Sequence, residues 1–131
     1  MGSAPEPTLV SVLSAKIHRA TVTAADMHYE GSITVDRGLM ARADLVPFQQ
    51  VQIYNITNGA RFETYVIEGE AETGTIQING AAAHLARPGD LIIIAAYTLV
   101  ARAQAAGWQP RIVLLDAENK PIVAAAGALG L

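Results

Sequence analysis

Residues 51–67 have the sequence VQIYNITNGARFETYVI, in which two strand-length runs flank the dipeptide Asn58-Gly59. The runs are rich in Val, Ile, Thr and Tyr, residue types that are typical of β-strands. A type I′ turn needs a positive φ at both of its central residues, and Asn followed by Gly tolerates this conformation best. The segment therefore predicts a hairpin in which residues 51–57 pair antiparallel with residues 60–67.

The rest of the chain alternates similar apolar runs with turn signals. Further strand-like runs lie at residues 9–19, 31–35, 74–78, 91–97, 111–116 and 122–124. Helical periodicity is brief and occurs at residues 39–45, 81–85 and 100–106. This pattern predicts a mainly β chain with short helices, and several strands at close spacing favour a closed barrel over an open sheet.

Composition indicates a single compact domain. The chain has 131 residues, of which 51% are hydrophobic and 16% are charged, so it is large enough to bury one sizeable core. We expect a flexible leader at residues 1–12, a barrel domain at residues 13–123 and a frayed tail at residues 124–131.

Composition also excludes several classes of function. The chain has no cysteine, so disulfides, zinc–thiolate sites and iron–sulfur clusters are excluded. A net charge of −3 without basic blocks, and an aromatic content of 5%, argue against nucleic acid as a partner. The longest apolar stretch, residues 91–96, is too short to span a membrane, and no signal peptide is recognisable, so we expect a cytoplasmic protein. The three histidines lack ligand-like spacing, and we expect no metal.

The dipeptide Gly31-Ser32 is the first candidate for chemistry, because it precedes a strand-like run. Taken alone, Gly-Ser is typical of a turn. Glycine also permits a strained backbone in which the hydroxyl of the next serine approaches the glycine carbonyl, and a nucleophile held in this way has a very high effective concentration. Strain at Gly31 could therefore drive an acyl shift.

Four further segments accompany this dipeptide: Lys16-Ile17-His18-Arg19, Asn58-Gly59-Ala60-Arg61, Thr64-Tyr65 and Asn79-Gly80-Ala81-Ala82-Ala83-His84. Each alone is compatible with an ordinary structural role, as a solvated strand, a hairpin, a half-buried strand pair or a turn that opens a short helix. Together, in this order and spacing, they resemble the pyruvoyl-dependent aspartate 1-decarboxylases. The resemblance extends from residue 13 to about residue 121.

The resemblance implies a six-stranded double-psi β-barrel that assembles as a homotetramer. It implies a proenzyme that cuts itself between Gly31 and Ser32, giving chains of residues 1–31 and 32–131. Ser32 then becomes a pyruvoyl group, which serves as the cofactor and forms a Schiff base with L-aspartate. The products are β-alanine, which feeds pantothenate biosynthesis, and CO2. The resemblance is compatible with a spontaneous cut and with one that a maturation factor assists.

The same resemblance assigns roles to individual residues. Ser32 is the pyruvoyl precursor, Tyr65 is the proton donor, and Thr64 and Tyr29 support processing. The implied substrate-binding residues are Arg61, Lys16, His18 and Tyr54, and those lining the cofactor carbonyls are Asn79, Gly80, Ala81 and Ala82. Strand alternation places Lys16 and His18 on one face. It places Thr64 opposite Arg61 and Tyr65, so all three can serve one site only if a bulge or twist intervenes.

Two features depart from the family pattern. The segment before Leu13 is longer than usual, and Tyr54 stands where some relatives carry tryptophan. The principal alternative is an uncleaved, non-catalytic β-barrel that acts as a binding or assembly module. A serine hydrolase that uses Ser32 and His18 is disfavoured, because no third orienting group or nucleophile elbow accompanies them.

Overall fold

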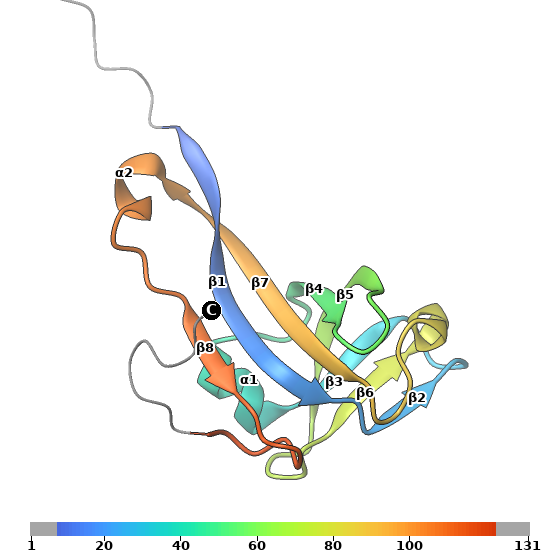
Figure 1. The fold of residues 1–131 in the computed structure, drawn as a ribbon. Helices are drawn as coiled ribbons and strands as arrows, with labels where there is room; N and C mark the ends of the chain where they lie inside the picture. The colour runs from blue at the N-terminus through green and yellow to red at the C-terminus, as the bar shows by residue number, and fades with distance from the viewer. Residues whose placement is uncertain (1–7, 123–131) are drawn as a thin grey trace, which may run out of the picture.

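The computed structural model describes residues 8–122, and Figure 1 shows their arrangement. The strands are β1 (Leu9–Thr21), β2 (Ala24–Asp26), β3 (Ser32–Asp36), β4 (Gln50–Asn55), β5 (Arg61–Gly69), β6 (Ile76–Asn79), β7 (Leu91–Ala101) and β8 (Arg111–Leu114). The helices are the α-helices α1 (Arg37–Ala43) and α2 (Arg102–Ala105) and the 3₁₀ helix η1 (Gly80–His84). The prediction of a mainly β fold with short helices is confirmed.

All eight strands form one mixed sheet with the order β2-β6-β3-β5-β4-β7-β1-β8. The pairs β2–β6, β3–β5 and β1–β8 are parallel, and the other neighbours are antiparallel. The short strands β2 and β8 form the two edges, so six strands lie between them. The strand β2 has no counterpart in the sequence prediction, because Ala24-Ala25-Asp26 contains no β-branched or aromatic residue.

The long pair of β1 and β7 sets which residues face inward. Ile17 pairs with Ile94, which pairs with Ile53 of β4, and all three side chains are buried. The next row along the same strands pairs His18 with Ile93. Because side chains alternate between the two faces of a sheet, this second row points away from the core. Lys16 lies two residues before His18 and shares its face, as the sequence predicts.

The hairpin between β4 and β5 is confirmed, but its turn differs from the prediction. The residues with positive φ include Gly59 and do not include Asn58, so the turn is not type I′. The amide of Gly59 bonds instead to the carbonyl of Asn55 at 2.8 Å, and the Asn55 side chain accepts the amide of Thr57 at 2.9 Å. Nδ2 of the Asn58 side chain donates a hydrogen bond to the carbonyl of Leu85 at 3.0 Å. These bonds favour a wider loop, which the local dipeptide alone does not reveal.

The ends of the domain differ in part from the expected boundaries. β1 begins at Leu9, which pairs with Ala101 of β7, so residues 9–12 belong to a strand and not to a leader. Ile122 lies in no strand, and residues 123–124 of the predicted last run are outside the described residues. The remainder of the expected leader and the tail, residues 1–7 and 124–131, are also outside them. No helix within residues 8–122 is long and apolar enough to cross a membrane.

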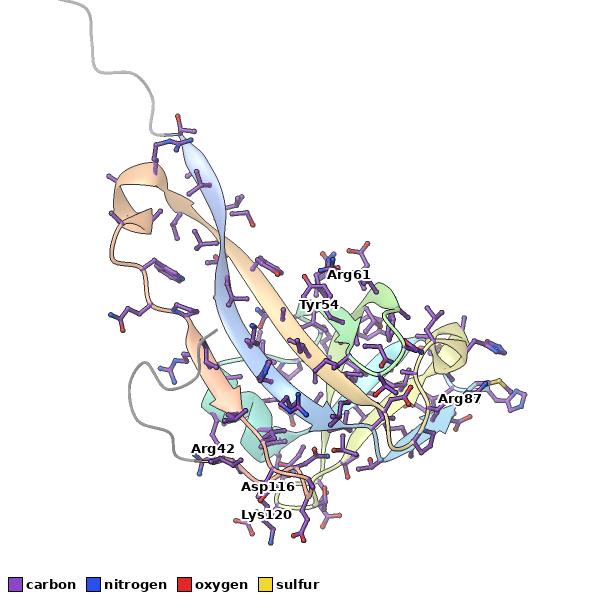
Figure 2. All side chains as sticks on the ribbon, in the orientation of Figure 1. Arg42, Tyr54, Arg61, Arg87, Asp116 and Lys120 are labelled. Carbon is purple, nitrogen blue, oxygen red and sulfur yellow. The ribbon has the colours of Figure 1, made fainter. Side chains whose placement is uncertain are left out.

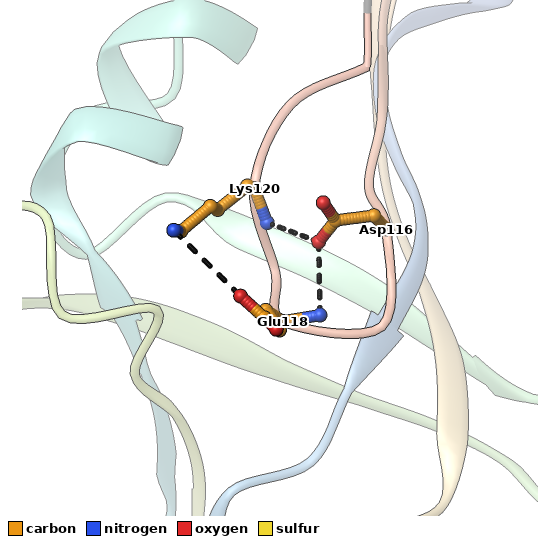
Figure 3. A network of polar contacts seen from close by, with 3 residues as sticks. All are labelled: Asp116, Glu118 and Lys120. Carbon is orange, nitrogen blue, oxygen red and sulfur yellow. Dashed lines mark hydrogen bonds and ion pairs between the residues drawn. The ribbon is translucent and has the colours of Figure 1, made fainter.

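A tight turn at residues 116–120 follows β8 (Figure 3). Asp116 accepts the amides of Glu118 at 2.8 Å and Lys120 at 3.0 Å, and these bonds hold the pKa of its carboxyl below the ordinary value. The ion pair of Lys120 with Glu118, at 3.6 Å, is exposed to solvent and therefore contributes little stability. The turn supports the bridge between Leu115 and Pro121.

Candidate active site

Ser32 begins β3 and is 1% exposed. Its hydroxyl donates to the carbonyl of Glu30 at 3.2 Å. Its Oγ also accepts a hydrogen bond from Nδ2 of Asn79 at 3.0 Å, because Asn79 lies directly opposite Ser32 in the antiparallel pair of β3 and β6. Asn79 is fully buried. The register of two strands that are distant in sequence thus brings the predicted nucleophile and the predicted amide together.

The strained glycine of this region is Gly80 and not Gly31. Gly80 has a φ of +76°, whereas Gly31 is outside the left-handed region. A β-carbon at Gly80 would lie 2.7 Å from the α-carbon of Gly31 and 3.1 Å from the carbonyl oxygen of Tyr29. Only glycine permits this approach without displacing backbone atoms. Gly80 therefore fixes the backbone before Ser32, while the Tyr29 side chain itself is exposed.

Thr64 and Tyr65 reach the same region through the parallel pair of β3 and β5. Ile33 pairs with Val66, so Ser32 and Tyr65 stand at the same level, one residue earlier on each strand. The pairing of β5 with β4 is regular from Arg61 to Tyr65. No bulge therefore interrupts this segment to bring the three side chains onto one face, and Thr64 stays on the face opposite Arg61 and Tyr65.

Arg61, Tyr54 and Tyr97 form a second group at the outer face of β4, β5 and β7. The Arg61 guanidinium carbon lies 4.2 Å from the centre of the Tyr54 ring, and Figure 2 shows the two side chains together. The Tyr54 and Tyr97 hydroxyls are hydrogen-bonded at 2.8 Å. This bond, together with burial, raises the pKa of Tyr97 above its ordinary value, although Arg61 opposes the shift. The sequence analysis did not identify Tyr97, because it lies in an apolar run without a local motif.

Lys16 and His18 lie farther along this face, on β1. Arg61, Tyr54, Ile93 and His18 are successive cross-strand partners on β5, β4, β7 and β1. At roughly 4.8 Å per strand, about 14 Å separate the backbones of Arg61 and His18. Burial lowers the pKa of His18, and the charges of Lys16 and Arg19 lower it further. The lowered pKa favours the neutral imidazole, and the buried Nδ1 of His18 has no hydrogen-bond partner among residues 8–122.

The structure thus divides the predicted residues into two groups. We call Gly31, Ser32, Asn79 and Gly80 the processing cluster, and we call Lys16, His18, Tyr54 and Arg61 the outer face. No hydrogen bond within the described part of the chain joins the two groups, and Ser32 does not bond to His18. The hydroxyl of Ser32 therefore lacks the histidine partner that a serine hydrolase requires.

The remaining predicted residues lie in η1, directly after Asn79. Ala81 is exposed, whereas Ala82 is half-buried and packs against the core. The carbonyl of Ala82 accepts the amide of Leu85 at 2.8 Å. The start of η1 is thus anchored next to the processing cluster.

Two further polar residues touch the processing cluster and were not identified from the sequence. The Gln77 side chain donates from Nε2 to Oδ1 of Asn79 at 2.8 Å. The Thr34 hydroxyl accepts from Nδ2 of Asn79 at 3.0 Å. The alternation of apolar and polar residues in Ile76-Gln77-Ile78-Asn79 could have indicated that Gln77 shares a face with Asn79.

A hollow of about 500 Å³ lies at the opposite end of β3, beside Asp36 and Asn119. Asp36 accepts the amides of Gly38 at 2.7 Å and Gly74 at 3.0 Å. Asn119 donates to the carbonyls of Thr21 and Gly74, each at 2.8 Å. The buried polar groups of this hollow are thus occupied in holding the fold.

Comparison with known proteins identifies the family of the chain. Residues 8–122 match the family model described as aspartate decarboxylase. The chain is also 52% identical over 111 residues to a protein of Myxococcus xanthus (strain DK1622) named aspartate 1-decarboxylase, and the match covers 85% of each chain. The chain therefore belongs to the aspartate decarboxylase family.

Proposed function

We propose that this protein decarboxylates L-aspartate to β-alanine and CO2, using a pyruvoyl group that it makes from Ser32. The observation that carries the proposal is the buried hydroxyl of Ser32, the residue directly after Gly31. This hydroxyl accepts a hydrogen bond from the Asn79 amide. Family membership supports the same reaction. The product β-alanine would feed pantothenate biosynthesis in the cytoplasm.

The group would form in three balanced steps. Oγ of Ser32 attacks the Gly31 carbonyl carbon, the bond from that carbon to the Ser32 nitrogen breaks, and the hydroxyl proton passes to this nitrogen. The α-proton of Ser32 then leaves and the Cβ–Oγ bond breaks, which gives a Gly31 carboxylate and a dehydroalanine. Water converts the resulting enamine to a ketone and releases ammonia. The nearby side-chain donor on Oγ is Asn79, whose hydrogen bond stabilises negative charge on that oxygen.

The residues around Ser32 fit such a group. The Ser32 side chain is buried, and the Asn79 amide can donate to a carbonyl oxygen. Because Gly80 has no side chain, η1 packs directly against the Gly31 backbone. Ala81 and Ala82 follow with backbone amides at the start of η1. At this position the ketone would supply the carbonyl that binds the substrate amino group and the electron sink for decarboxylation.

The outer face supplies the cations that select a dicarboxylic substrate. The Arg61 guanidinium carbon lies 4.2 Å from the centre of the Tyr54 ring, and a guanidinium presents a planar fork of donors that matches a carboxylate. Lys16 adds a second positive charge. Because burial lowers the pKa of His18 and so favours its neutral form, we assign it a polar contact with the substrate.

Tyr65 would protonate the carbon that has lost CO2, because its strand position is level with Ser32. Its ring lies 6.2 Å from that of Phe48, centre to centre. Thr64 would support the Gly31 carbonyl during processing, and Tyr29 would order the segment before the cut.

The separation of the two groups favours assembly as a homotetramer. Arg61 and Tyr65 are four residues apart on β5, which corresponds to roughly 13 Å along the strand. Contact between the outer face of one copy and the processing cluster of another would bring both groups to a single substrate. A maturation factor would act on the cut and not on turnover.

Intact mass spectrometry of the purified protein, together with a denaturing gel, tests this function. We expect two pieces, the larger beginning at residue 32 and lighter by one ammonia than the product of simple hydrolysis. Ser32→Ala should remain whole. The cut protein should convert aspartate and leave alanine and asparagine unchanged. A whole wild-type chain without aspartate turnover would favour a non-catalytic binding or assembly module.

A further inference from the structure

Four polar side chains form one hydrogen-bonded row across β3 and β6. Ser32 stands opposite Asn79, and Thr34 stands opposite Gln77, so all four share one face of the strand pair. Asn79 and Ser32 are 0% and 1% exposed, whereas Gln77 and Thr34 are half-buried. Every polar atom of the Asn79 side chain has a partner in this row.

The two ends of the Asn79 amide have opposite roles. Oδ1 accepts from Nε2 of Gln77 at 2.8 Å, whereas Nδ2 donates to the oxygens of Ser32 and Thr34, both at 3.0 Å. A carboxamide that flips exchanges its donor and acceptor ends. A flipped Asn79 would accept the Ser32 hydroxyl proton and would no longer donate to Oγ.

We propose that Gln77 is a positioning residue for self-processing: it fixes the orientation of the Asn79 amide so that Nδ2 donates to Oγ of Ser32. This inference rests on the proposed function and adds a determinant of the cutting rate. With Nδ2 donating, the Ser32 hydroxyl hydrogen is directed to the Glu30 carbonyl. The same donor then stabilises the negative charge that Oγ carries when its proton leaves and again when the Cβ–Oγ bond breaks.

Substitution at Gln77 tests the orientation directly. Gln77→Met removes the donor without adding charge, and loss of one net hydrogen bond corresponds to cutting that is roughly 3- to 10-fold slower. Gln77→Glu replaces the donor by an acceptor of the same shape, which favours the flipped amide, and should slow cutting more. The measurement is the rate at which pulse-labelled chains give the two fragments, and it does not depend on aspartate turnover.

Two controls separate orientation from charge and from general damage. Gln109→Met and Gln109→Glu make the same changes at an exposed glutamine outside the row and should leave the cutting rate unchanged. In an Asn79→Ala background, Gln77→Glu should have no further effect, because the amide through which Gln77 acts is gone.

Cutting of Gln77→Met and Gln77→Glu at the wild-type rate would overturn the inference while leaving the proposed function intact. An equal slowing by Gln77→Glu with and without Asn79 would also overturn it, since a charge effect would then explain the result. A wild-type chain that is never cut would contradict the proposed function, and the inference with it.

Discussion

We expect the missing side chain of Gly80 to control the rate of the proposed cut. Its φ is +76°, and the backbone of Gly31 occupies the space that a β-carbon would need. We expect Gly80→Ala to slow self-cutting and to lower the free energy of unfolding by about 1 to 3 kcal/mol, through backbone strain and displacement of Gly31. Cutting is followed on a gel, and stability by urea unfolding of the variant in a Ser32→Ala background.

Gly107→Ala is the matched control for this change. Gly107 has a φ of +79°, but no atom lies within 4 Å of an added β-carbon. Gly107→Ala should therefore lower the free energy of unfolding by about 1 kcal/mol, through backbone strain alone, and should not slow the cut. Equal cutting rates for the two variants would mean that the contact between Gly80 and Gly31 is not important for processing.

Tyr65 should affect turnover and leave the cut unchanged. Tyr65→Phe removes the hydroxyl but keeps the ring beside Phe48, and loss of a positioned general acid slows a reaction by about 10² to 10⁴. We expect complete conversion to two fragments with a strongly reduced kcat for aspartate. The comparison is made by mass spectrometry and a β-alanine assay on the same preparation. Near-native kcat would assign the proton donor to water or to another residue.

At the scale of an element, Asp36 ties the end of β3 to α1 and to the loop before β6. Burial alone would raise the pKa of its carboxyl, but backbone donors led by Gly74 and Gly38 outweigh burial and lower the pKa below 3.8. A lowered pKa in the folded state means that the carboxylate stabilises the fold above pH 3.8. This stabilisation is lost as the pH falls through the folded-state pKa.

Asp36→Ala should therefore lower the free energy of unfolding by about 1 to 3 kcal/mol at neutral pH, through loss of the helix cap and of the bond to Gly74. The difference from wild type should shrink in acid, because the wild-type carboxyl is then protonated. Urea unfolding at several pH values, in a Ser32→Ala background, measures both effects. If the difference in free energy of unfolding between Asp36→Ala and wild type stays constant into acid, the charge-based explanation is contradicted. The exposed Glu70→Ala serves as control.

Elements with local signals could be predicted from the sequence, whereas their partners could not. Runs of Val, Ile and Thr identified β1, β4 and β5, because these residues favour extended backbone. The strand β2 lacked such residues, and the turn at Asn58 was altered by a bond to distant Leu85. The site residues that the family resemblance implies were assigned without knowledge of their contacts, and their roles stay predictions. Gln77 and Tyr97 were missed, since their hydrogen bonds to Asn79 and Tyr54 arise from contacts that no local motif reveals.

At the scale of the whole molecule, the separation between the processing cluster and the outer face predicts complementation between copies. Chains with Ser32→Ala keep the outer face, and chains with Arg61→Ala keep the processing cluster. If one substrate contacts both groups from different copies, co-expression of the two inactive variants should restore part of the aspartate turnover through mixed assemblies.

The control is co-expression of Ser32→Ala with Asn79→Ala, two changes within the same cluster, which should restore nothing. Differently tagged copies, purified in two steps, establish that mixed assemblies have formed. Mixed assemblies of the first pair without activity would mean that Arg61 and Ser32 act within one copy.

A cut before Ser32, at the start of β3, would also change how the protein regains its fold. A cut before Ser32 leaves β1 in the small piece, yet β1 pairs along nearly its whole length with β7 of the large piece. In the uncut chain this pairing is a first-order event, because the Gly31–Ser32 bond keeps the two partners at a high effective concentration. After the cut, denatured protein must recover by a collision of two molecules. Its renaturation rate should increase with protein concentration, whereas that of Ser32→Ala should remain independent of it up to the assembly step.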